Sequence, residues 1–204
     1  MGETDEPLPG DPLPDEPLRG DPLPGDPGSE EAVVLADGQT IFVRPIRPTD
    51  RPLFLEGMKH LSPRTWLYRF LAPRDHLEAA ELEYLTHPDG TTHFALGACT
   101  RDGAGREGPV AVARYARLPQ RPDTAECAIL VVDAFQGRGV GRLMGERLME
   151  TARARGVESF HCVVLLENER MTHLIRSLAP AAQSHVDGSH LVFRVPLGSA
   201  GDAS

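Results

Sequence analysis

The most constraining feature of this chain is an apolar run that passes through a glycine-rich turn into a helical pattern. Residues 128–132 are all apolar, which predicts a buried strand. Three glycines fall within 136–141, and an apolar stripe at helical spacing begins at Val140. A strand that enters a helix in this way leaves backbone N–H groups pointing at one place, where the helix dipole adds partial positive charge. Such a turn is suited to hold phosphate.

The spacing of the glycines decides which phosphate loop fits. The dinucleotide fingerprint Gly-x-Gly-x-x-Gly fails, because Arg142 and Met144 stand where its third glycine would be. A P-loop fails as well, because no lysine follows these glycines. The pattern that is present is Gln-x-x-Gly-x-Gly, formed by Gln136, Gly139 and Gly141. A plain strand–turn–helix without a ligand is the alternative, although a glycine within a helix start costs roughly 1 kcal/mol.

This loop resembles the pyrophosphate loop of the GNAT family of acyl-CoA-dependent N-acetyltransferases. The resemblance implies a mixed α/β fold with a central, mostly antiparallel twisted sheet flanked by helices. It also implies acetyl-CoA as co-substrate. We expect no metal, because the eight histidines are scattered without metal-ligand spacing. In the family, the strand before the loop pairs through its backbone with the pantetheine arm of CoA, and this role maps to Val131. The loop residues that would hold the pyrophosphate are Gln136, Gly137, Arg138, Gly139, Val140, Gly141 and Arg142.

Acetyl transfer to an amine needs a base, a polarised carbonyl and two reactants held together. A lysine ammonium has a pKa near ~10.4, so a base must remove a proton at neutral pH. Glu126 is the candidate, because it lies in an apolar run on the same side as Ala128 and Leu130. We expect burial to raise its pKa, and a solvated carboxylate at a strand edge is the alternative. The resemblance agrees, since protein lysine acetyltransferases of the family carry their general base, a glutamate, in this strand.

A second similarity lies downstream of the loop, where Asn168 separates a predicted strand from a predicted helix. GNAT proteins often have Asn here, bonding near the CoA arm, and frequently a Tyr seven residues later as general acid. Ile175 stands at that later position, so a tyrosine acid is not expected. His173 is more typical of a surface residue. Protonation of the leaving thiolate by water is sufficient, since a free thiol has a pKa of only ~8.5.

The N-terminal half carries a further resemblance. Residues 42–50, 61–64 and 68–70 look like the start of the GNAT domain in bacterial Pat-type protein lysine acetyltransferases. Those enzymes acetylate and silence acyl-CoA synthetases at an active-site lysine, so the resemblance implies a protein lysine acceptor such as an acyl-CoA synthetase. Pat-type enzymes often carry an attached regulatory domain. We expect none here, because the proline-rich N-terminal residues cannot form one.

The rest of the pattern predicts a mixed α/β sheet, since strands alternate with helices along the chain. Asp37-Gly38 indicates a hairpin, Asp50 is a candidate cap for a helix, and Ser62-Pro63 begins another. The predicted strands are 32–35, 40–44, 92–99, 109–117, 124–132, 158–166 and 190–196. Besides the two helices that begin near residues 50 and 62, the predicted helices are 76–86, 139–155 and 168–178.

Composition divides the chain into three parts. Residues 1–30 hold nine acids and one base, a charge of −8, so the formal −9 of the chain leaves −1 for residues 31–204. Their prolines and isolated leucines predict a disordered acidic tail, followed by an acetyltransferase domain over 31–198 and a disordered end over 199–204. The tail could bind a partner through its Pro-x-x-Pro spacings, or be an inert leader. The near-neutral domain excludes a strong nucleic-acid footprint.

Several other classes are excluded. Cys99, Cys127 and Cys162 read as buried thiols in a reducing compartment, and the absence of a Cys-x-x-Cys pair argues against zinc. No apolar run approaches ~18 residues and no signal peptide precedes the domain, so we expect a cytoplasmic protein without a membrane span. Two alternatives stay open: a small-molecule amine N-acetyltransferase, and an acyl-CoA-binding sensor without catalysis. Glu126 argues against the sensor, which has no need of a base.

Overall fold

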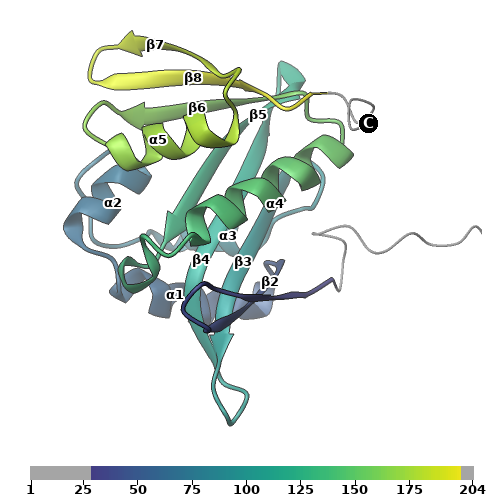
Figure 1. Ribbon diagram of the computed structural model, residues 1–204, viewed down its shortest axis with the longest axis vertical. Helices are drawn as coiled ribbons and strands as arrows, with labels where there is room; N and C mark the ends of the chain where they lie inside the picture. Colours follow the sequence, from purple (N-terminus) through teal and green to yellow (C-terminus); the bar gives the residue numbers. More distant parts are fainter. Residues whose placement is uncertain (1–28, 199–204) are drawn as a thin grey trace, which may run out of the picture.

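A computed structural model describes residues 29–198 as a central sheet with helices on both faces (Figure 1). The eight strands lie in the order β1-β2-β3-β4-β5-β6-β8-β7, and every neighbouring pair is antiparallel except β5 and β6. This confirms the predicted mixed α/β fold with a mostly antiparallel sheet. The predicted tail, apart from residues 29 and 30, and the predicted end 199–204 lie outside the described residues.

Most elements fall where the sequence pattern predicts them. The strands are β1 (Glu31–Val34), β2 (Thr40–Pro45), β3 (His93–Arg101), β4 (Glu107–Leu118), β5 (Arg121–Val131), β6 (Ser159–Leu165), β7 (Gln183–Asp187) and β8 (His190–Pro196). The helices are α1 (Arg51–Lys59), α2 (Pro63–Phe70), α3 (Ala79–Thr86), α4 (Val140–Ala154) and α5 (Glu169–Leu178), with short 3₁₀ turns at Pro48–Asp50 and Asp133–Phe135. No helix within residues 29–198 is long and apolar enough to cross a membrane.

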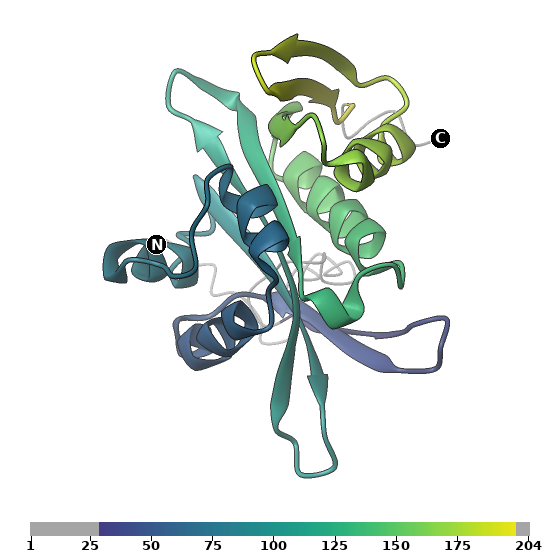
Figure 2. The same cartoon turned by 90° about the vertical axis from the view of Figure 1, so that its left-hand side faces the viewer.

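Figure 2 shows α4 and α5 on one face of the sheet and α1 and α3 on the other. The stripe that predicted α4 is the side it buries, because Val140, Met144 and Leu148 are all at most 1% exposed. Burying a side chain of this size stabilises the fold by roughly 1.5–3 kcal/mol. On the other face, Phe54 of α1 and Leu82 of α3 pack in a separate, smaller cluster.

The local signals near the N-terminus are borne out except at Asp50. Gly38 has a φ of +86° in the turn between β1 and β2, and Ser62 Oγ accepts the Thr65 N–H at the start of α2. Asp50 precedes α1 but makes no side-chain cap to it. Its carboxylate instead accepts hydrogen bonds from Arg44: Nη1 donates to Oδ2 at 2.7 Å, and Nη2 donates to Oδ1 at 2.8 Å. The predicted cap is wrong because a buried arginine, supplied by β2, competes for the same oxygens.

The strand β7 was not predicted. It pairs with β8 from Gln183↔Arg194 to Asp187↔His190, and the turn between them contains Gly188 at a φ of +57°. All its residues are exposed, so the sequence has no alternation of buried and exposed side chains to reveal it. The first residues of the predicted helix 76–86 are also not helical. There Glu78 and Glu81 form a capping box, which starts α3 at Ala79.

Candidate active site

Two neighbouring strands of the sheet, β5 and β6, separate partway along their length. β5 and β6 run parallel and pair only from Thr124↔Ser159 to Glu126↔His161. A cavity of about 450 Å³ occupies the gap beyond this point, which is within the size range of small-molecule sites. Glu126 is therefore the last residue of β5 that pairs with β6, and it lies on the cavity wall.

The cavity has walls on both faces of the sheet. On the α4 and α5 side the lining residues are Gly145, Leu148, Met149, Asn168, Met171, Leu174, Ile175 and Leu178. On the other side they include Tyr68 and Arg69 of α2, Tyr84 and Leu85 of α3, and Arg114 and Ala116 of β4. Gly145 lets Leu178 pack closely against α4, since an added Cβ would come within 2.6 Å of Leu178 Cδ1 and displace it. Two ligands can thus approach one another from opposite faces.

Glu126 lies on the face of the sheet that carries α1 and α3. The register pairs Ala116 with Glu126 and Arg114 with Ala128, which places these side chains on one face. The predicted alternation is therefore confirmed. The predicted burial is wrong, because Glu126 is exposed at the point where β5 leaves β6. The site offers a solvent-accessible carboxylate rather than a desolvated one.

The side chain of Gln136 ties the glycine-rich loop to two neighbouring segments. Its Nε2 lies 3.1 Å from the Val131 backbone oxygen, 3.1 Å from Asp133 Oδ1 and 3.2 Å from Thr65 Oγ1. Its Oε1 accepts Arg170 Nη1 of α5 at 3.2 Å. The end of β5, the start of α2 and the start of α5 are thus held together around the loop.

The loop delivers its backbone amides to the start of α4. Gly137 and Gly139 have φ values of +75° and +83°, and Gly139 is the N-cap residue. The amides of residues 140–142 have no acceptor within the helix, because the first turn of any helix lacks one. Gly141 packs beside Leu174, with 3.5 Å between an added Cβ and Leu174 Cδ2. The helix start therefore adjoins the cavity wall, although residues 136–142 do not line the cavity.

Both arginines of the loop are bound to other side chains. Arg138 forms an ion pair with Asp37, donates to Gln39 Oε1 at 2.7 Å and lies over the Phe135 ring. Arg142 pairs with Glu146 one turn along α4, at 3.1 Å. Each guanidinium is thus paired with a carboxylate, that of Arg138 in the β1–β2 turn and that of Arg142 along α4.

Asn168 is buried at the start of α5 and lines the cavity. Its Oδ1 accepts the Met171 N–H at 3.2 Å, so the side chain caps the helix. Ile175, which stands where the tyrosine acid of other GNAT proteins would be, also lines the cavity. His173 is exposed and is not among the lining residues, as a surface histidine would be.

Sequence reasoning missed several polar groups of the cavity. His161 is the register partner of Glu126, and Arg69 and Arg114 line the wall on the same side of the sheet. A lone arginine within the apolar run 110–116 was a usable signal for Arg114. The Sγ atoms of Cys127 and Cys162 lie 2.9 Å apart on the wall, and this contact together with burial raises the pKa of Cys162.

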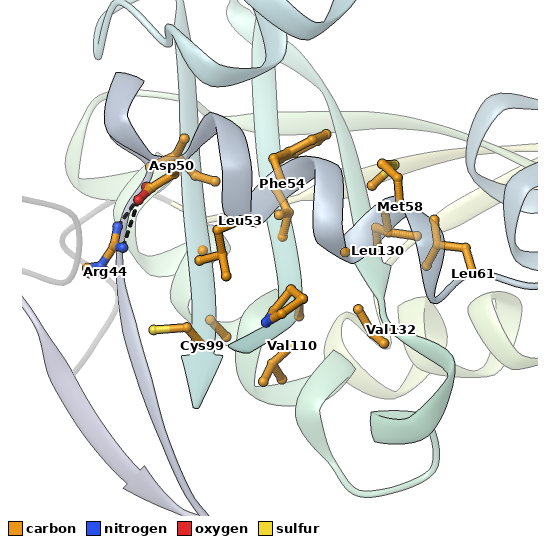
Figure 3. A pocket seen from close by; sticks show the side chains of 17 residues that line it. Arg44, Asp50, Leu53, Phe54, Met58, Leu61, Cys99, Val110, Leu130 and Val132 are labelled. Carbon is orange, nitrogen blue, oxygen red and sulfur yellow. Dashed lines mark hydrogen bonds and ion pairs between the residues drawn. The ribbon is translucent and has the colours of Figure 1, made fainter. Parts of the chain in front are cut away.

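A second, smaller cavity lies between α1 and the sheet (Figure 3). Apolar side chains such as Leu53, Phe54 and Val110 line it, and the Arg44–Asp50 ion pair lies at one end. Its volume is about 40 Å³, enough for a water molecule or two but not for an organic substrate. The large cavity is therefore the candidate active site.

Two parallel strands separate partway along their length, and the first of them leads through a glycine-rich loop into a helix. This arrangement agrees with a known family. A model of the acetyltransferase (GNAT) family matches residues 55–179. The chain belongs to the GNAT family. Its members transfer acetyl groups from acetyl-CoA to amines, and the chain is an acetyltransferase of this class.

Relatives of the GNAT chain include Pat-type proteins. It is 31% identical over 165 residues to acetyltransferase PA5475 of Pseudomonas aeruginosa, covering 80% of the chain and 87% of the relative. It is 34% identical over 147 residues to acetyltransferase Pat of Mycolicibacterium smegmatis, covering 72% of the chain but only 43% of that longer protein. The crystal structure of the GNAT domain of S. lividans PAT superposes with a TM-score of 0.73 at 30% identity, covering 82% of the chain and 96% of that domain.

Proposed function

We propose that this acetyltransferase modifies lysine side chains of proteins, and that acyl-CoA synthetases are its acceptors. The observation that carries the proposal is the position of Glu126, an exposed carboxylate where a two-sided cavity crosses the sheet. The likeness to Pat-type relatives over most of the chain supports a protein acceptor. A protein-borne lysine is long enough to reach a carboxylate inside such a cavity.

The donor side of the site fits acetyl-CoA, which supplies an activated acyl carbon. The amides and the positive dipole end of α4 suit a pyrophosphate. Arg138 and Arg142 lie in the same loop, each paired with a carboxylate that a pyrophosphate would have to compete with. The cavity between α4 and α5 adjoins that helix start through Leu174 and has room for a pantetheine arm. The residues assigned to acetyl-CoA are Val131, Gln136, Gly137, Arg138, Gly139, Val140, Gly141, Arg142 and Asn168.

The acceptor side supplies the base. Glu126 takes the proton that the lysine ammonium must lose, directly or through a water molecule, because an exposed carboxylate admits solvent. The freed amine then attacks the acyl carbon and the carbon–sulfur bond breaks. The nitrogen releases its second proton to water as the amide forms, and water protonates the departing thiolate. Ile175, which stands where a tyrosine acid would be, offers no proton for this last step.

The proposal is tested with purified protein, acetyl-CoA and a panel of acyl-CoA synthetases, measuring thiol release and lysine acetylation. Glu126→Gln should lower kcat about 10²- to 10⁴-fold and leave acetyl-CoA affinity unchanged. The matched control is Glu158→Gln, an exposed glutamate immediately before β6 that does not line the cavity.

Three results would contradict the proposal. Full activity in Glu126→Gln would show that Glu126 is not the general base. Acetylation of small amines, with acetyl-CoA bound but no synthetase modified, would show that the acceptor is a small molecule and not a protein. Binding of acetyl-CoA without transfer to any amine would indicate an acyl-CoA sensor without catalysis.

A further inference from the structure

Two arginine side chains of the cavity have no carboxylate partner within residues 29–198. Arg114 of β4 is only 6% exposed, and Arg69 lies half-buried in the last turn of α2. Both line the cavity on the face of the sheet that carries Glu126. Among the described residues, no carboxylate shifts the pKa of either guanidinium, and the group of opposite sign that acts on both is the Tyr84 phenol.

Neutral groups hold Arg114 in place. Its Nη2 donates to the Leu85 backbone oxygen at 2.9 Å, and its Nη1 lies 3.1 Å from His93 Nε2. Burial lowers the pKa of Arg114 to about 9, and the nearby charge of Arg69 adds to this. The guanidinium is still protonated at neutral pH, so its partners position the charge without neutralising it.

The two cations lie beside the route of the acceptor. Arg114 and Glu126 are diagonal neighbours on adjacent strands, a relationship in which residues typically lie about 7–8 Å apart. A cation that is buried without a counter-charge raises the free energy of the folded protein. An anion entering this part of the cavity relieves that cost, whereas a polycation increases it.

We propose that Arg69 and Arg114 form an anion subsite that binds a carboxylate carried by the acceptor close to the reacting amine. This rests on the proposed function and specifies its substrate class: the modified lysine has an acidic side chain near it in the acceptor protein. The α-carboxylate of a free amino acid offers the same chemistry. Polyamines, which carry only positive charge, are poor acceptors.

The first test uses lysine peptides with glutamate placed one or two residues from the lysine, and the same peptides with glutamine instead. The glutamate peptides should have a kcat/KM at least about tenfold higher, mainly through KM, because one charge-assisted hydrogen bond has this strength. Arg69→Gln should abolish the preference. Arg176→Gln, an exposed arginine of α5 outside the cavity, should keep it. Equal kcat/KM for both peptide sets would overturn the subsite.

The second test does not depend on catalysis. With CoA present at saturation to fill the phosphate loop, sulfate should raise the Tm of the wild-type protein and of Arg176→Gln, but not of Arg69→Gln. An equal rise in all three proteins would overturn the subsite even if the acceptor is a protein. Acetylation of free amino acids but of no peptide would retain the subsite and remove the protein acceptor.

Discussion

The side chain of Gln136 donates a hydrogen bond to the backbone oxygen of Val131 over 3.1 Å. This bond closes the turn between the end of β5 and the start of α4, and the same nitrogen reaches Thr65 of α2. A single amide group therefore sets the position of the loop relative to the cavity. Gln136, the first residue of the Gln-x-x-Gly-x-Gly motif, thus fixes the conformation of the loop.

Replacing Gln136 with Ala should loosen the loop, because its contacts with β5, α2 and α5 are lost together. We expect about a tenfold weaker acetyl-CoA affinity, the equivalent of one or two net hydrogen bonds, and a smaller change in kcat. Isothermal titration with acetyl-CoA measures the first, and steady-state kinetics the second. Gln183→Ala, in the exposed strand β7, is the control. Unchanged affinity in Gln136→Ala would contradict this role.

Gly139→Ala should destabilise the protein by about 1–2 kcal/mol, since the residue has a φ of +83°. A Cβ there meets no atom within 4 Å, so the loss comes from the backbone alone. Gly156 has a φ of +76° and equally open surroundings after the end of α4. Gly156→Ala should therefore cost a similar free energy of unfolding in urea but keep full acetyl-CoA affinity. Equal loss of affinity in both variants would argue against a phosphate loop at Gly139.

His93 makes stability depend on pH. It is buried, stacks on Tyr84 and accepts a hydrogen bond from Arg114 Nη1. Burial is the main cause that lowers its pKa to about 4, and the positive charge of Arg114 is the second. The negative charge of Asp89 has a smaller, opposite effect on this pKa. In the unfolded chain its pKa is near ~6.5. The unfolded state thus binds the proton first, so stability is full above pH 6.5 and is lost as the pH falls toward 4.

Between pH 7 and pH 5, this histidine should account for about 2 kcal/mol of lost stability. Urea unfolding at both pH values measures it, and His93→Gln should show a correspondingly smaller loss than the wild type. His173→Gln is the control, since His173 is exposed on α5. An identical pH dependence in His93→Gln and the wild type would show that His93 is not the titrating group.

Cys127 reports on occupancy of the cavity. Its thiol is half-buried on the wall, whereas Cys99 lines the smaller cavity. We expect saturating acetyl-CoA to slow alkylation of Cys127 by N-ethylmaleimide at least about tenfold, as measured by peptide mass spectrometry. Cys99 is the internal control, because burial raises the pKa of its thiol to about 11 away from the bound ligand. Unchanged labelling of Cys127 would place acetyl-CoA elsewhere.

The parts of the fold and site that could be predicted are those encoded by neighbouring residues. The α4 stripe, the Asp37-Gly38 turn and the glycine-rich loop each depend on a short stretch of chain. β7 was missed because every one of its side chains is exposed. Its strand character comes from pairing with β8, which no local pattern records.

The missed site residues depend on contacts between distant segments. Arg69 and Arg114 meet in the cavity only because α2 packs beside the parted strands. The exposure of Glu126 depends on where β6 ceases to pair with β5. Register and helix docking set both features, so the type of residue could be read from the sequence while its surroundings could not.

Because β5 and β6 separate after Glu126, each of them has a side within the sheet that no strand of the described residues pairs with. Among the described residues, no strand pairs with that side of β5 beyond Glu126, so its N–H and C=O groups there, apart from the Val131 oxygen that Gln136 occupies, are open to a guest. A ligand arm with amide groups of its own can lie along this edge as a short substitute strand. Affinity gained in this way comes from the main chain, and it should survive side-chain changes along β5 that would abolish an ordinary pocket.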